Sequence, residues 1–124
     1  MKRSCKKILI VEDDQESALL LKTRLESEGF EVILSSSGQE GLMMARHEKP
    51  NLIILDVMLP IMDGCTICRL LKFDKRFQHI PILLLTGRAG TSDKEKGTTV
   101  KADGYITKPF DPRELLSIIQ NLIQ

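Results

Sequence analysis

Apolar residues along this chain fall into short runs separated by longer stretches of mixed polarity. Residues 7–11 (KILIV), 52–56 (LIILD) and 81–86 (PILLLT) are almost continuously apolar over the length of a strand. Residues 30–35 (FEVILS) alternate between apolar and polar positions, and residues 104–107 (GYIT) form a fifth, shorter run. Continuous runs indicate strands buried on both faces, whereas alternation indicates a strand with one exposed face.

Segments with helical spacing and helix-boundary residues lie between these strands. Residues 15–28 place apolar side chains on one face, and Gly29 follows as a stop signal. Ser37 and Glu40 have the spacing of a capping box, which predicts a helix that ends near His47. Two further helices are predicted, over residues 64–73 and from the N-cap residue Asp111 to the end of the chain.

The alternation of strands and helices predicts an α/β fold. Strands that are apolar on both faces belong to parallel sheets covered by helices, and the crossovers are right-handed. We therefore expect a doubly wound five-stranded parallel sheet with helices on both faces, in a single domain over residues 1–124. In such sheets the functional site lies beyond the carboxyl ends of the strands.

Composition and charge exclude several functional classes. The formal net charge is +1, so no large basic field attracts nucleic acid or a membrane surface. No apolar run approaches the roughly 20 residues that span a bilayer, and no secretory signal pattern begins the chain. The three cysteines are an odd number, unlike a disulfide framework. These features predict a cytoplasmic protein.

Chemically distinctive residues stand where the predicted strands end. Glu12 and Asp13 follow the first strand, Asp56 ends the third, Thr86 ends the fourth, and Lys108 follows the fifth. Because the carboxyl ends of parallel strands meet on one edge of a sheet, we expect these side chains to lie together. Neither a glycine-rich dinucleotide fingerprint nor a P-loop motif occurs, so these nucleotide-binding classes are excluded.

Clustered carboxylates repel one another unless a cation lies among them. Mg²⁺ prefers oxygen ligands and keeps several waters, so one or two carboxylates together with phosphate oxygens suit it, and Mn²⁺ favours the same ligands. A lysine can hold a phosphoryl oxygen, a threonine can donate to another, and an aspartate can attack phosphorus to form an aspartyl phosphate. The residues therefore predict a metal-dependent site for phosphoryl chemistry.

Four ordered segments resemble motifs of the receiver domain of two-component response regulators, a resemblance that covers essentially the whole chain. They are ILIVEDD (8–14), LIILDVMLPIMDG (52–64), ILLLTG (82–87) and YITKPF (105–110). The spacings agree as well, with 43 residues from Asp13 to Asp56, 30 to Thr86 and 22 more to Lys108. The resemblance implies a flavodoxin-like sheet with strand order 2-1-3-4-5 and a phosphoacceptor rather than an enzyme.

The resemblance also implies a role for each acid. Asp56 would accept a phosphoryl group from a phosphohistidine of a sensor kinase or of a histidine phosphotransfer protein. Asp13, Asp56 and the backbone oxygen of Met58 would bind Mg²⁺, and Glu12 would act mainly through a metal-bound water. After transfer, the only reactions expected of the domain itself are self-phosphorylation from phosphodonors and slow self-dephosphorylation.

The same resemblance implies how the signal is passed on. Lys108 would bridge to the acids before phosphorylation and to the phosphoryl group afterwards, with a cis bond to Pro109. Thr86 would move toward the phosphoryl group, and Tyr105 would rotate inward. The changed surface would be the face formed by the fourth helix, the fifth strand and the last helix, which would meet an output domain or protein and not nucleic acid.

Two regions bear on the lifetime of the phosphoryl group and on the structure of the fourth-helix segment. Met58 and Arg88 occupy positions that tune hydrolysis in the family. Met58 offers no strong hydrogen bond to a water, and Arg88 could cover the phosphoryl oxygens, so phosphoryl decay is expected to be slower than in fast chemotaxis-type members. Lys101 stands where the family often has glycine, and Ala89–Lys101 is poor in apolar residues. We expect this fourth-helix segment to be short, irregular or mobile before phosphorylation.

Two other functions compete with this interpretation. An aspartate-nucleophile phosphohydrolase would want a second acid two residues after the nucleophile, and that place holds Met58, which cannot transfer protons. An interaction domain with a silent site is the other alternative, and the complete set of Asp13, Asp56, Thr86 and Lys108 argues against it.

A C-x-x-C sequence raises a separate question. Cys65 and Cys68 lie within a predicted helix, the only other cysteine is Cys5, and His47 and His79 lie at no ligand-like spacing. A redox or metal site needs an exposed helix start or a second pair of ligands. We therefore interpret the pair as structural.

Overall fold

The computed structural model describes residues 6–87 and 102–123, and its centre is one sheet of five parallel strands. The strand order is β2-β1-β3-β4-β5, so the predicted flavodoxin-like topology is confirmed. The strands are β1 (Lys7–Val11), β2 (Glu31–Ser35), β3 (Leu52–Asp56), β4 (Ile82–Thr86) and β5 (Gly104–Thr107). The helices are α1 (Gln15–Ser27), α2 (Gly38–Glu48), α3 (Gly64–Lys72) and α5 (Pro112–Ile123).

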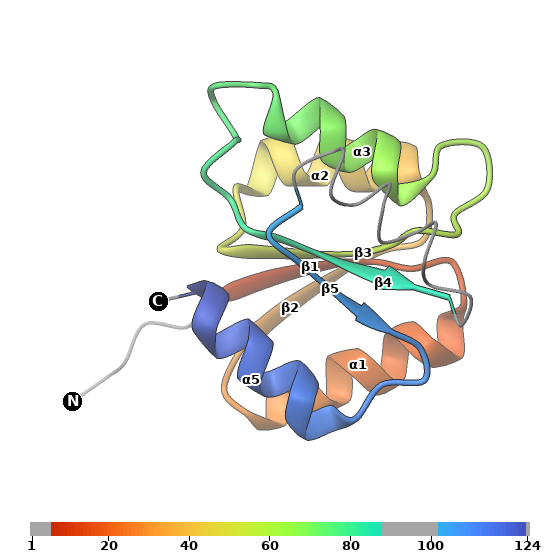
Figure 1. Cartoon of the computed structure of the whole chain (residues 1–124), viewed down its shortest axis with the longest axis vertical. Helices are drawn as coiled ribbons and strands as arrows, with labels where there is room; N and C mark the ends of the chain where they lie inside the picture. The colour runs from red at the N-terminus through yellow and green to blue at the C-terminus, as the bar shows by residue number, and fades with distance from the viewer. Residues whose placement is uncertain (1–5, 88–101, 124) are drawn as a thin grey trace.

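Helices cover both faces of the sheet. Helices α2 and α3 lie on one face, and α1 and α5 lie on the other (Figure 1). Among the residues described, no helix is both long and apolar enough to cross a membrane. Arg88 and the predicted fourth-helix segment Ala89–Lys101 lie outside the described residues.

Each central strand contributes to two separate cores. Leu9 and Val11 of β1 pack in the cluster under α2 and α3, whereas Ile8 and Ile10 pack in the cluster under α1 and α5. All five residues of β3 and of β4 are buried. Side chains alternate between the faces of a strand, so a strand between two helical layers is apolar at nearly every position. This explains the continuous apolar runs in the sequence.

The predicted capping box at the start of α2 forms only in part. The hydroxyl of Ser37 accepts the backbone N–H of Glu40 at 3.2 Å, as predicted. The carboxylate of Glu40, however, accepts the N–H of Ser36 at 3.4 Å and lies 3.2 Å from the hydroxyl of Ser35. Ser35 is buried at the end of β2, and its hydroxyl also lies 2.9 Å from the carbonyl of Ser37, so Glu40 is a second and longer contact of that hydroxyl.

The last helix also differs from its predicted pattern. Asp111 accepts the backbone N–H of Arg113 at 2.9 Å, so it caps α5 as predicted. Leu115 and Ile119 are fully buried. The other two residues of the predicted stripe, Ile118 and Leu122, are only partly buried against the same cluster. The buried stripe of α5 is therefore narrower than the sequence pattern predicts.

The start of α3 approaches the end of β3 very closely. The N–H of Gly64 donates to the carbonyl of Val57 at 3.2 Å. A Cβ atom on Gly64 would overlap the backbone carbonyl of Asp56, which belongs to the same short stretch of chain. Only glycine fits this position without moving backbone, so Gly64 helps to fix where the carboxylate of Asp56 lies.

Replacing Gly64 by alanine is therefore expected to destabilise the protein. The overlap with backbone is expected to lower the free energy of unfolding by about 1–3 kcal/mol, although alanine is the better helix former. Gly104→Ala is the matched control, because a Cβ there would meet only side chains, the nearest at 3.4 Å. Urea unfolding followed by circular dichroism measures both variants, and equal midpoints for the two would contradict the prediction.

Candidate functional site

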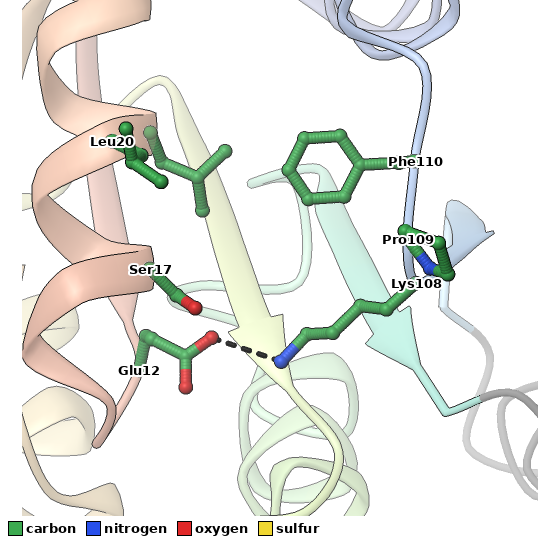
Figure 2. Close-up of a pocket in the computed structure, with 7 residues that line it drawn as sticks. Glu12, Ser17, Leu20, Lys108, Pro109 and Phe110 are labelled. Carbon is green, nitrogen blue, oxygen red and sulfur yellow. Dashed lines mark hydrogen bonds and ion pairs between the residues drawn. The ribbon is translucent and has the colours of Figure 1, made fainter.

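Two buried acids and one lysine meet at the carboxyl edge of the sheet. Glu12 follows β1, Asp56 ends β3, and both are almost fully buried. The ammonium of Lys108, just after β5, lies 3.0 Å from a carboxylate oxygen of each. Figure 2 shows Lys108 reaching across from its loop to Glu12. A single cation thus pairs with two carboxylates that come from different strands.

A third acid completes the cluster, which we call the acid site: Glu12, Asp13, Asp56 and Lys108. Asp13 is exposed, and one oxygen from each of the three carboxylates lies within 4.8 Å of the others. Three convergent carboxylates, one of them open to solvent, suit a hard divalent cation such as Mg²⁺ or Mn²⁺. The donor set present in this structure therefore fits the predicted metal.

The electrostatics of the acid site reflect this crowding. Burial raises the pKa of Glu12 to about 7, and the hydrogen bond with Asp56 adds to this rise, while Lys108 opposes it. Partial burial lowers the pKa of Lys108, but its hydrogen bonds to Asp56 and Glu12 outweigh that effect and leave the pKa raised. Lys108 is therefore positively charged at neutral pH. The three carboxylic acids of the site outnumber this single cation.

Backbone groups hold two of the acids in place. The N–H of Met58 donates to one oxygen of Asp56 at 3.0 Å, and the N–H of Asp14 donates to one oxygen of Glu12 at 3.2 Å. The side chain of Met58 points outward and is 69% exposed. These bonds leave the remaining carboxylate oxygens of Asp56 and Glu12 to Lys108.

Thr86 lies at the same sheet edge but is turned away from the acids. Its buried hydroxyl lies 3.4 Å from the carbonyl of Ile106 and 3.4 Å from the hydroxyl of Thr107, both in β5. Its carbonyl accepts the backbone N–H of Lys108 at 2.8 Å. The bond from Lys108 to Pro109 is cis, as the resemblance implies. Of the predicted site residues, the structure thus gathers the acids and Lys108, with Thr86 beside them.

Comparison with known proteins agrees with this geometry. Residues 8–120 match the family described as the response regulator receiver domain. The chain belongs to this family. It is 44% identical over 119 residues to the alkaline phosphatase synthesis transcriptional regulatory protein PhoP of Bacillus subtilis, a match that covers 96% of this chain and 49% of that protein. The chain therefore spans about half the length of that relative.

Solved structures support the same assignment. A CheY-like receiver domain protein from Methanospirillum hungatei superposes with a TM-score of 0.89 at 34% identity, covering 97% of this chain and 94% of that one. The receiver domain of the sensor histidine kinase PA1611 from Pseudomonas aeruginosa, which has a magnesium ion coordinated in its active-site cleft, gives 0.89 at 29% identity and covers 97% and 98%. Receiver domains are phosphoacceptors rather than enzymes, so the phosphohydrolase alternative is set aside.

Sequence reasoning missed a cavity on the α1 side of this receiver domain. The cavity measures about 620 Å³ and lies beside the acid site. Ser17 and Leu20 of α1 form one wall, and Pro109 and Phe110 form the other (Figure 2). No local pattern could have revealed it, because its two walls come from opposite ends of the sequence.

Sequence reasoning also missed an unusual turn in the loop between β3 and α3. Ile61 has a φ of +68°, and the N–H of Met62 donates to the carbonyl of Pro60 at 2.7 Å. The side chain of Ile61 is completely exposed. Nothing in the sequence signals this conformation, because β-branched residues rarely adopt a positive φ.

The C-x-x-C pair takes no part in the acid site. Cys65 and Cys68 are buried in α3, and neither forms a disulfide. Burial raises the pKa of the Cys68 thiol to about 12. A thiol that is buried and fully protonated neither attacks disulfides nor binds metal readily, so the structural interpretation of the pair agrees with these observations.

We therefore expect the two helical cysteines to resist thiol reagents in the native protein. At pH 8 a thiol with a pKa of about 12 is ionised in roughly one molecule in ten thousand. In a Cys5→Ser variant, Ellman's reagent is expected to react with less than a tenth of the thiols before unfolding and with both after guanidinium is added. Rapid reaction in native conditions would contradict the structural interpretation.

Proposed function

We propose that this chain is the phosphoacceptor module of a cytoplasmic two-component phosphorelay, with Asp56 as the acceptor. The phosphoryl group would come from a phosphohistidine of a sensor histidine kinase or of a histidine phosphotransfer protein. The observation that carries the proposal is the placing of the Lys108 ammonium 3.0 Å from both Asp56 and Glu12, with Asp13 beside them. This arrangement combines a nucleophile, a fixed cation and a set of metal ligands.

The proposed reaction is a direct transfer between two protein side chains. A carboxylate oxygen of Asp56 forms a bond to phosphorus while the phosphorus–nitrogen bond of the donor breaks, and the histidine nitrogen keeps the bonding electrons. Asp13, Asp56 and the backbone oxygen of Met58 would hold Mg²⁺, with Glu12 acting through a water. The metal would offset the negative charge of the phosphoryl oxygens, and Lys108 would bind one of those oxygens.

Phosphorylation would then act on residues beside the acid site. It adds a charge of roughly −1.5 to −2 and three acceptor oxygens, which attract Lys108 and the hydroxyl of Thr86. The present partners of that hydroxyl lie at 3.4 Å, near the limit for a hydrogen bond, so they hold it weakly. Tyr105, which is 38% exposed in β5, would rotate inward as Thr86 moves.

The surface that changes on phosphorylation and contacts the downstream partner would be the face that includes β5 and α5, together with the fourth-helix segment. The Bacillus relative is a transcriptional regulatory protein about twice as long as this chain. We therefore infer that the partner on this face is an output domain or a separate output protein, and that this receiver domain itself contacts no nucleic acid. An interaction domain with a silent site is the remaining alternative.

Labelling by a small phosphodonor separates the phosphoacceptor from the silent domain. Acetyl phosphate with Mg²⁺ or Mn²⁺ is expected to add one phosphoryl group to the wild-type chain, as measured by intact-mass spectrometry. Asp56→Asn, which preserves the shape of the site, is expected to take up none. Labelling of Asp56→Asn, or equal labelling of the wild type in excess EDTA, would contradict the proposal.

The lifetime of the phosphoryl group tests the role of Met58. Its exposed side chain lies beside Asp56 and offers no strong hydrogen bond to an attacking water. Met58→Asn supplies such a group and is expected to speed hydrolysis several-fold, measured as loss of the added mass after the donor is removed. Met58→Leu, which remains apolar, is the control. If the two variants decay at the same rate, Met58 is not the tuning position, and Arg88 would have to be tested next.

A further inference from the structure

The cavity between α1 and the β5–α5 loop has a polar end and an apolar end. Glu12, Ser17 and the ammonium of Lys108 form the polar end, and Leu20 and Phe110 face each other across the apolar end (Figure 2). Its volume of about 620 Å³ falls within the range of roughly 300–1,000 Å³ that is usual for small-molecule sites. A cavity divided in this way suits a small molecule with one polar group on an apolar body.

The apolar end can still bury more surface. Leu20 lines the cavity from α1 and is 73% exposed, and Phe110, on the opposite wall, is only half-buried. An apolar body held between the two side chains would be withdrawn from water together with both of them. The hydrophobic effect therefore favours a ligand whose body is about the size of an aromatic ring system.

The polar end offers hydrogen-bond acceptors. The hydroxyl of Ser17 donates its hydrogen to Asp14 at 2.9 Å, so its oxygen is available to accept. The two carboxylate oxygens of Glu12 accept from Lys108 and from the N–H of Asp14, one bond at each oxygen. Because a carboxylate oxygen can accept two hydrogen bonds, Glu12 can accept from one more donor. An ammonium group, which has three donors and no acceptor, matches this end of the cavity.

Net charge decides between a ligand amine and a ligand acid. Lys108 uses two of its three N–H groups on Glu12 and Asp56, so its third could in principle serve a carboxylate. The adjoining acid site, however, holds three carboxylates and one ammonium. This surplus of negative charge attracts a cation and repels an anion.

We propose that this cavity is a binding site for a small organic amine with a ring-sized apolar body. The ammonium of the ligand donates to Glu12 and Ser17. Its apolar body lies between Leu20 and Phe110. This binding goes beyond the proposed function and does not require phosphorylation of Asp56.

A bound amine would also act on the acid site, because Glu12 belongs to both the cavity and the acid site. The ammonium and a Mg²⁺ ion would be two cations close to the same carboxylates, and like charges repel. Each would therefore weaken the binding of the other by the same factor. The amine would in this way oppose the loading of the acid site with metal.

Three indole compounds of one shape test the choice of ligand. The probe is tryptamine; tryptophol carries a hydroxyl in place of its ammonium, and indole-3-propionate carries a carboxylate. The chain contains no tryptophan, so the indole fluorescence comes from the probe and its anisotropy reports binding. Tryptamine is expected to bind with a Kd on the order of 0.1–1 mM, about tenfold tighter than tryptophol, and indole-3-propionate is expected to bind most weakly.

Variants of two adjacent leucines test the location. Leu20→Asn is expected to weaken tryptamine binding about fivefold. Leu19→Asn is the matched control and is expected to leave it unchanged, because Leu19 is also exposed on α1 but is not among the residues that line this cavity. Glu12→Gln is expected to remove most of the preference for tryptamine over tryptophol. Excess Mg²⁺ is expected to weaken wild-type binding several-fold more than NaCl of the same ionic strength.

Four outcomes would overturn the proposal. Undetectable binding of tryptamine at millimolar protein shows that the cavity takes no such ligand. Equal or tighter binding of indole-3-propionate shows that the polar end does not select an amine, and this comparison uses only the wild-type chain. Equal weakening by Leu20→Asn and Leu19→Asn shows adsorption to the surface of α1. Equal effects of Mg²⁺ and NaCl show that the ammonium does not lie at Glu12. Labelling of Asp56 by acetyl phosphate is unaffected in all four cases, so the proposed function is judged separately.

Discussion

The geometry of the acid site depends on one interaction, the pairing of Lys108 with two buried carboxylates. Glu12 and Asp56 come from neighbouring strands and are withdrawn from water, a state that costs several kcal/mol for each unpaired charge. Lys108 reaches them from beyond β5, so its ammonium ties the last strand of the sheet to the first and the third. Lys108 pairs with two of the three clustered carboxylates and carries a single positive charge, and the remaining negative charge suits a divalent metal.

Sheet register determines which acids meet. Val11 of β1 lies opposite Leu55 of β3, so Glu12 and Asp56, each one residue further on, become neighbours at the sheet edge. A slip of one residue would turn every side chain of a strand to the opposite face. The central strands are apolar toward both cores, so the close packing of their side chains in each core, rather than polarity, opposes such a slip. The packing that stabilises the fold is therefore also what aligns the acids.

Much of this arrangement could be predicted from the sequence. Continuous apolar runs located the strands, and the rule that parallel strands end on one edge brought Glu12, Asp13, Asp56 and Lys108 together. Other features depend on three-dimensional detail that periodicity does not encode. The carboxylate of Glu40 lies against the N–H of Ser36 and the hydroxyl of Ser35 instead of the N–H of Ser37, and Ile61 has a positive φ against its own preference. The orientation of the buried Thr86 hydroxyl toward β5 depends on a hydrogen-bond partner in a strand that comes later in the chain.

The backbone hydrogen bonds at Thr86 affect how fast its hydroxyl could move after phosphorylation. Its carbonyl is bonded to the N–H of Lys108, and Thr86 is in register with Thr107, so the main chain at this position is held against β5. The proposed movement of the hydroxyl then reduces to a rotation about one side-chain bond that breaks only long contacts. Side-chain rotations take picoseconds to nanoseconds at exposed sites and are slower in packed interiors, yet they remain far faster than typical phosphoryl transfer. The arrival of the phosphoryl group, and not the motion of Thr86, would therefore set the pace of signalling.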